Sequence, residues 1–134
     1  MSTNSETIIP STSRTLHGSA SLTGDPYKGD GFYGRTDGLH TVQVSITDFI
    51  GRISIQGTLE INPTESDWFT VELGTGAMSI DTTGLVAEQK ITFVDYIGST
   101  TNTKTYNFIG NLVWVRAKIS NWTDGAINSI KLNH

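Results

Sequence analysis

Cysteine is absent from this chain of 134 residues. The protein therefore has no disulfide framework, no thiolate nucleophile and no cysteine-based metal site. Charge is also sparse, since 16% of residues are charged and the net charge is −4. The nine basic residues are scattered, which argues against an electrostatic contact with nucleic acid. A signal peptide and an apolar segment long enough to cross a membrane are both missing from the sequence.

Helical periodicity is missing as well. Alanine, leucine, glutamate, lysine, methionine and arginine never cluster into a long segment with a repeat of about 3.6 residues. Threonine, serine, glycine, asparagine and isoleucine are abundant instead, a mixture that favours strands and tight turns. The length fits one domain with a single core. We therefore expect an all-β protein with little helix.

Apolar and polar residues alternate over most of the chain, as in strands with one buried face. About eight short strands are predicted, at residues 42–46, 53–61, 69–73, 78–80, 91–93, 106–108, 112–119 and 127–132. Turns or loops are predicted between them at Asp48–Gly51, Asn62–Thr64, Gly74–Gly76, Asp81–Gly84, Gly98–Lys104 and Asp124–Gly125, the last as a hairpin. This spacing predicts an antiparallel β-sandwich that is jelly-roll-like.

The first 25 residues differ from the rest in composition, because serine and threonine dominate them. We interpret residues 1–25 as a partly extended N-terminal arm and residues 26–134 as the β-sandwich domain. Such an arm can order against a partner. An edge strand of the domain, built around Ile8 and Ile9, is the alternative.

The residue patterns of known enzymes are missing too. His17, His40 and His134 have no spacing that predicts a zinc site. The acidic residues Glu60, Glu65, Asp67 and Glu72 form a local cluster, which we interpret as solvated charge rather than as a glycosidase or calcium site. We therefore expect a protein that is not an enzyme and that has no cofactor and no metal.

Aromatic side chains are the remaining candidates for a binding site. Three tryptophans could stack on sugar rings, plug the edge of the core or meet a neighbouring subunit, and Arg116 and Lys118 share a strand face with one of them. The candidate residues for an interface or for glycan stacking are Trp68, Trp114, Trp122 and Arg116.

Two blocks of strand-and-turn motifs carry a resemblance to a known group of proteins. The first block has the form G-x-I-x-I-Q-G-T-L at Gly51–Leu59, followed by Asp67-Trp68-Phe69 and Val71. The second block runs through Tyr106–Asn111, Val113–Ala117 and Thr123–Ile127. Over roughly residues 30–132 the chain resembles small virion structural proteins of tailed phages, in particular phages of marine and aquatic bacteria.

The resemblance implies a β-sandwich exposed on, or built into, a virion that assembles in the host cytoplasm. It implies capsid decoration, or an accessory role at the head, neck or tail, through contacts with other virion proteins, and it carries over no catalytic residue. Exposed sheet edges predict self-association, and a trimer is our first expectation. A carbohydrate-binding module for host attachment is the alternative function.

Overall fold

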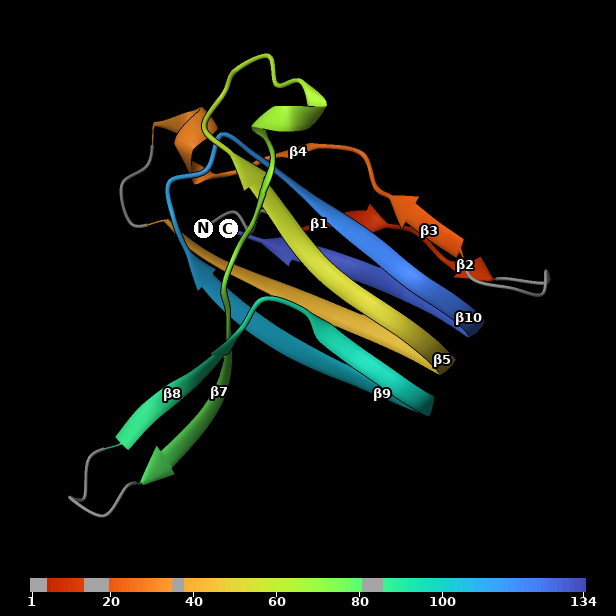
Figure 1. Ribbon diagram of the computed structural model, residues 1–134. Helices are drawn as coiled ribbons and strands as arrows, with labels where there is room; N and C mark the ends of the chain where they lie inside the picture. Colours follow the sequence, from red (N-terminus) through yellow and green to blue (C-terminus); the bar gives the residue numbers. More distant parts are fainter. Residues whose placement is uncertain (1–4, 14–19, 35–37, 81–85) are drawn as a thin grey trace.

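The computed structural model describes residues 5–13, 20–34, 38–80 and 86–134 (Figure 1). Strands make up most of these residues, together with two short 3-10 turns, η1 (Asp30–Tyr33) and η2 (Glu65–Asp67). The strands are β1 (Ser5–Ile9), β2 (Thr12–Ser13), β3 (Ala20–Thr23), β4 (Tyr27–Lys28), β5 (Leu39–Thr58), β6 (Phe69–Thr70), β7 (Leu73–Ile80), β8 (Val86–Ile91), β9 (Val94–Ile109) and β10 (Trp114–Asn133). The prediction of an all-β fold is confirmed.

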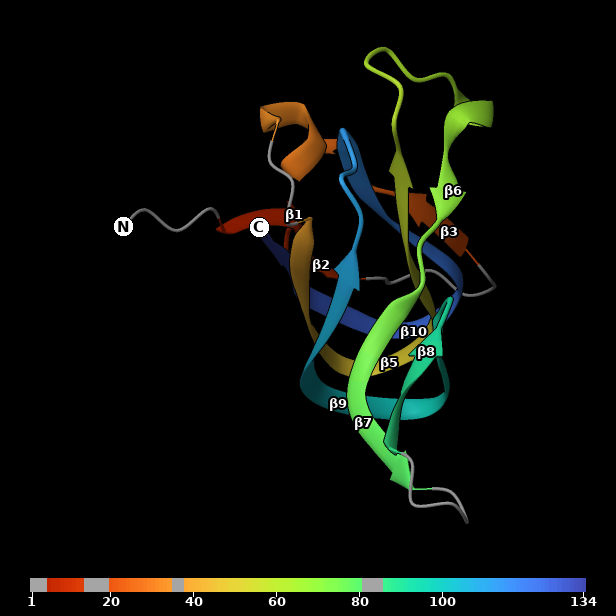
Figure 2. The ribbon, with the colours of Figure 1, turned by 90° about the vertical axis from the view of Figure 1, so that its left-hand side faces the viewer.

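All the described strands belong to one antiparallel sheet, whose order is β1-β10-β5-β9-β7-β8. Its centre is a ribbon of the three long strands β9, β5 and β10, which pair along most of their lengths. The ribbon bends sharply near its middle, so that its two halves form two layers around a core (Figures 1 and 2). The sandwich predicted from the sequence is thus one sheet folded over on itself.

The bend in β5 lies where the sequence predicts a turn, at Asp48–Gly51. Asp48 has a left-handed φ of 51°, and the pairing with β9 shifts register between Ile46 and Phe49. Buried residues fall at even positions before the bend, up to Ile46, and at odd positions after it, from Phe49. The extra residue therefore keeps the same face of the strand toward the core on both sides of the bend.

A second bend, in β10, replaces the predicted hairpin at Asp124–Gly125. That prediction is wrong, because the segments on both sides of Gly125 pair with β5 and not with each other. Gly125 has a φ of 81°, and a Cβ atom there would lie 2.1 Å from the Asp48 carbonyl oxygen. Only glycine allows the two bends to approach so closely.

The loop predicted at Gly98–Lys104 is also wrong, since these residues continue strand β9. The segment is polar because it is exposed, while its threonines suit a strand. Thr103 pairs with Ser45 of β5 in the sheet, and the Thr101 hydroxyl accepts a hydrogen bond of 2.9 Å from the Asp48 backbone N–H. The turn predicted at Asp81–Gly84 lies outside the described residues.

The described part of the N-terminal segment forms strands at the edge of the sheet. Strands β1, β2, β3 and β4 pair in turn with β10, from its C-terminal end to its N-terminal end. Ile8 and Ile9 are buried in the core, and Asn133 donates a 2.7 Å hydrogen bond to the Ser5 hydroxyl. The described residues of this segment thus satisfy backbone groups that the outer edge of β10 would otherwise leave unpaired.

Three aromatic side chains fill the inner corner of the bend. The Phe49 side chain is fully buried, and its ring centroid lies 5.7 Å from that of Tyr96 and 5.8 Å from that of Trp122. Burial raises the pKa of the Tyr96 hydroxyl, with a further contribution from neighbouring Tyr106. The corner is thus an apolar plug that links β5, β9 and β10.

We expect Phe49→Ala to lower the free energy of unfolding by about 3–5 kcal/mol, since it leaves a cavity where the three strands bend. Ile97→Ala is the control, because this isoleucine is 90% exposed and does not line the pocket around Phe69. It should cost less than about 1 kcal/mol. Urea denaturation followed by tryptophan fluorescence measures both values. Similar losses for the two variants would contradict the role of Phe49.

Candidate functional site

Three of the four predicted site residues lie together on the outer side of the sheet. Trp68, Trp114 and Arg116 line an open hollow of about 610 Å³, which we call the tryptophan–arginine hollow. Arg116 and Trp114 come from the start of β10, and Trp68 follows η2. Residues that complete the lining are Thr23, Gly24, Pro26, Ile61, Asn62, Pro63 and Glu65.

Trp122, the fourth predicted residue, is part of the core. Its side chain is 4% exposed and packs against Phe49. Its Nε1–H donates to the carbonyl oxygens of Asp124, at 3.0 Å, and Gly125, at 3.3 Å. For Trp122, plugging the core is therefore the alternative that the structure shows.

Arg116 is buried and fully engaged. Its Nε–H donates to the Gln56 side-chain oxygen at 2.8 Å, and its two terminal nitrogens donate to the Glu65 carboxylate at 3.1 and 3.0 Å. The guanidinium group lies 4.2 Å from the centroid of the Trp68 ring. A two-point contact of this kind fixes the plane of the guanidinium. Arg116 thus holds the η2 loop against the sheet, and one face of Trp68 is covered.

The Glu65 carboxyl group belongs to the η2 loop. Its hydrogen bonds with Arg116 and the charge of Arg116 hold its pKa below the ordinary value of 4.5, and Lys118 adds a smaller effect. Another member of the predicted acidic cluster, Asp67, caps η2 by accepting a 2.8 Å hydrogen bond from the Thr64 backbone N–H. The cluster therefore shapes a loop and its contact with the sheet.

Trp114 is held in place at its polar edge. Its Nε1–H donates to the Ile61 carbonyl oxygen at 2.9 Å, and its ring centroid lies 5.2 Å from that of Phe32. Both contacts limit rotation of the side chain, which stays partly exposed. A partly exposed and fixed indole ring can stack on a flat apolar surface without a large loss of conformational entropy.

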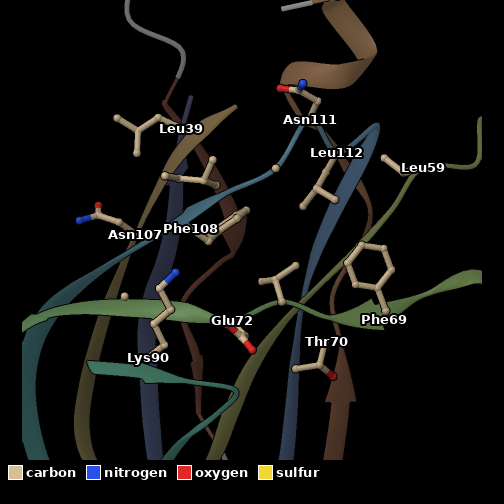
Figure 3. A pocket seen from close by; sticks show the side chains of 14 residues that line it. Leu39, Leu59, Phe69, Thr70, Glu72, Lys90, Asn107, Phe108, Asn111 and Leu112 are labelled. Atoms are coloured by element: carbon tan, nitrogen blue, oxygen red, sulfur yellow. The ribbon is translucent and has the colours of Figure 1, made fainter. Parts of the chain in front are cut away.

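A second hollow, which the sequence analysis did not identify, lies where the two layers open (Figure 3). Its volume is about 640 Å³, and its walls are mostly apolar. Four exposed apolar side chains rim it, Leu39, Leu59, Phe69 and Ile109, of which Ile109 is 80% exposed. We call it the apolar hollow. Apolar side chains gathered in this way mark contact sites for other molecules.

The signal for the apolar hollow was present in the sequence as apolar residues out of phase with their strands. Ile109 follows buried Phe108 and therefore points to the other side of β9. It pairs in register with Leu39 of β5. The strand predicted at residues 53–61 puts Leu59 in phase with buried Ile53 and Ile55, but β5 ends at Thr58 and Leu59 is exposed.

The acidic residues weighed as a glycosidase or calcium site do not converge, whereas two of the histidines lie near each other. Glu72 lies at the rim of the apolar hollow, Glu60 is exposed and Asp67 caps η2. His134 Nδ1 lies 3.0 Å from Asp30 Oδ1, and the rings of His134 and His40 are 5.9 Å apart. Over the part of the chain that the structure describes, no three His, Asp or Glu side chains are grouped so as to hold a metal ion.

Comparison with protein-family models gives no match, and neither does comparison with curated proteins. Among solved structures, the chain is similar to the SPBc2 prophage-derived protein YomS. The two share 17% sequence identity and superpose with a TM-score of 0.50, over 96% of this chain and 95% of that one. The similarity shows a shared fold. The chain is thus an all-β module that shares its fold with a prophage-derived protein.

We expect Arg116→Gln to raise the pKa of Glu65 toward its ordinary value of 4.5, because Arg116 is the main cause of the lowering. An NMR titration of the Glu65 carboxyl carbon measures the change. A carboxyl whose pKa is lowered in the folded protein stabilises the fold above its ordinary pKa, and this contribution is lost as the pH falls. Arg52→Gln is the control, and equal Glu65 titration curves in both variants would contradict the assignment.

Proposed function

We propose that the protein is a non-enzymatic structural component of a phage particle, which acts through contacts with other proteins. Decoration of the capsid, or an accessory place at the head, neck or tail, is the role we favour. The virion is then its location, after assembly in the host cytoplasm. The prophage origin of a protein with the same fold supports the phage context.

The observation that carries this proposal is the apolar hollow. A monomeric protein in water gains nothing from exposing Leu39, Leu59, Phe69 and Ile109 at one place. Covering them with a partner removes apolar surface from water, at roughly 25 cal/mol per Å² before the costs of association. Apolar side chains clustered at a pocket are typical of the energetic centre of protein interfaces.

The protein itself is one of the proposed partners. We propose a homo-oligomer, with a trimer as the expected state, because identical subunits usually associate with closed symmetry. Other capsid, neck or tail proteins are the second kind of partner. Mass spectrometry of purified particles tests the location directly, and absence of the chain from particles made by the genome that encodes it would contradict the proposal.

Replacing apolar side chains at the hollow should abolish association without unfolding the protein. We expect Phe69→Ser combined with Ile109→Ser to give a monomer in multi-angle light scattering, since both side chains are exposed in the single chain. Thr103→Ser, on the exposed part of β9, is a control that should keep the wild-type mass. A wild-type protein that stays monomeric at high concentration would count against self-association.

A carbohydrate-binding module for host attachment is the second candidate function. The observation that favours it is the tryptophan–arginine hollow, in which two tryptophans and the polar side chain of Asn62 line one open surface. Indole rings stack on the apolar faces of sugars, and amides bind their hydroxyl groups. Coverage of one Trp68 face by Arg116 leaves Trp114 as the main stacking residue.

A glycan array separates the two functions. Saturable binding that is lost in Trp114→Ala and kept in Trp114→Phe would support the carbohydrate-binding function, because phenylalanine retains an aromatic face. The Phe69→Ser and Ile109→Ser variant should bind glycans normally, since its changes lie at the other hollow. Absence of binding to any glycan would exclude this second candidate.

A further inference from the structure

Three basic side chains lie on the outer face of the second layer, in a chain that is acidic overall. Arg116, Lys118 and Arg52 lie there, three of the nine basic residues of a chain with a net charge of −4. They alternate with polar side chains of the paired strands. We call this surface the basic strip, formed by Arg52, Ser54 and Gln56 of β5 and by Arg116, Lys118 and Ser120 of β10.

Each end of the basic strip has an arginine on an aromatic ring and beside a carboxylate. At one end Arg116 lies over Trp68 and binds Glu65. At the other end the Arg52 guanidinium lies 3.9 Å from the centroid of the Phe93 ring and 3.3 Å from Asp95. Both arginines are thus neutralised, and both ends offer aromatic surface.

The middle of the strip differs, because the charge of Lys118 has no direct partner. Among the ion pairs of the described residues, none includes Lys118. Lys118 lines an open hollow of about 430 Å³, together with four hydroxyl-bearing side chains. These hydroxyls belong to Ser54, Thr70, Thr92 and Ser120. An unneutralised ammonium group among hydroxyls suits an anionic group of a ligand that also carries hydroxyls.

The hollow at Lys118 adjoins the tryptophan–arginine hollow. Gln56 lines the hollow at Lys118, and its side-chain oxygen accepts a hydrogen bond from Arg116, which lines the tryptophan–arginine hollow. From Trp114 to Ser120 the strand extends about 20 Å, at roughly 3.3 Å a residue. The two hollows therefore lie next to each other on the outer face of β10, with the Trp68 ring and the Glu65 carboxylate over Arg116 between them. A linear chain of several sugar residues fits such a surface better than a compact ligand does.

We propose that the basic strip binds a linear oligosaccharide that carries carboxylate groups, with one carboxylate paired to Lys118. The sugar hydroxyls bond to Ser54, Gln56 and Ser120, and a sugar ring stacks on Trp114 beyond the strip. The proposal rests on the carbohydrate-binding function above and names its ligand class. It does not depend on the apolar hollow or on the structural role in the phage particle.

Isothermal titration calorimetry at low salt tests the proposal with two matched probes, a galacturonic acid hexamer and its methyl ester. We expect the free acid to bind at least roughly tenfold more tightly than the ester, since only the acid forms a charge-assisted bond with Lys118. Lys118→Gln should remove this difference and leave binding of the ester unchanged. Lys104→Gln, on the exposed part of β9 away from the strip, should keep it.

The possible results distinguish the proposed ligand class from the carbohydrate-binding function itself. Equal affinity for acid and ester would overturn the proposed ligand class and leave the carbohydrate-binding function in place. Failure of both probes to bind the wild-type protein would overturn the proposed ligand class, while the glycan array decides separately on the carbohydrate-binding function. A preference for the acid that survives in Lys118→Gln would overturn the role of Lys118, and circular dichroism of each variant confirms that it is folded.

Discussion

The three long strands β5, β9 and β10 bend together, and both the enclosed core and the position of the exposed surfaces depend on this bend. Strands β5 and β10 remain paired through it, with left-handed residues at Asp48, Asn121 and Gly125. Each bulge adds the residue that keeps apolar side chains facing inward on both sides of the corner. Phe49 and Trp122 fill the corner, so the bend is closed by packing as well as by backbone geometry. One folded ribbon thereby encloses a core that a flat sheet could not bury.

The same bend explains where the exposed surfaces lie. Folding the ribbon brings the two ends of β5 to one side of the molecule, where the layers open and Leu39, Leu59 and Ile109 surround the apolar hollow. On the outer face of the second layer, the η2 loop covers Arg116, while Lys118 and the hydroxyl side chains beside it line an open hollow. An apolar opening and a polar outer face are therefore separate surfaces, and each can contact a different kind of partner.

Strand faces and changes of chain direction could be predicted from the sequence, but the pairing partners of the strands could not. Alternation correctly placed Val42, Val44 and Ile46 in the core and Trp114, Arg116 and Lys118 on the opposite face. The chain does change direction at Asp48 and Gly125, as the turn residues predicted. The same residue types occur in a bend and in a hairpin, however, and only the pairing partner of each strand distinguishes the two. The apolar hollow was missed because its members are far apart in sequence and meet only in the folded sheet. Burial of Trp122 likewise depends on a corner that no local pattern reveals.

The claim that the protein works by covering its apolar hollow with a partner is tested most directly by cryo-electron microscopy of the particle. We expect density for this chain on or in the particle, with a side chain of another polypeptide seated between Phe69 and Ile109. Density in which this hollow faces solvent in every copy of the chain would contradict the proposed role, and so would a complete particle that lacks the chain.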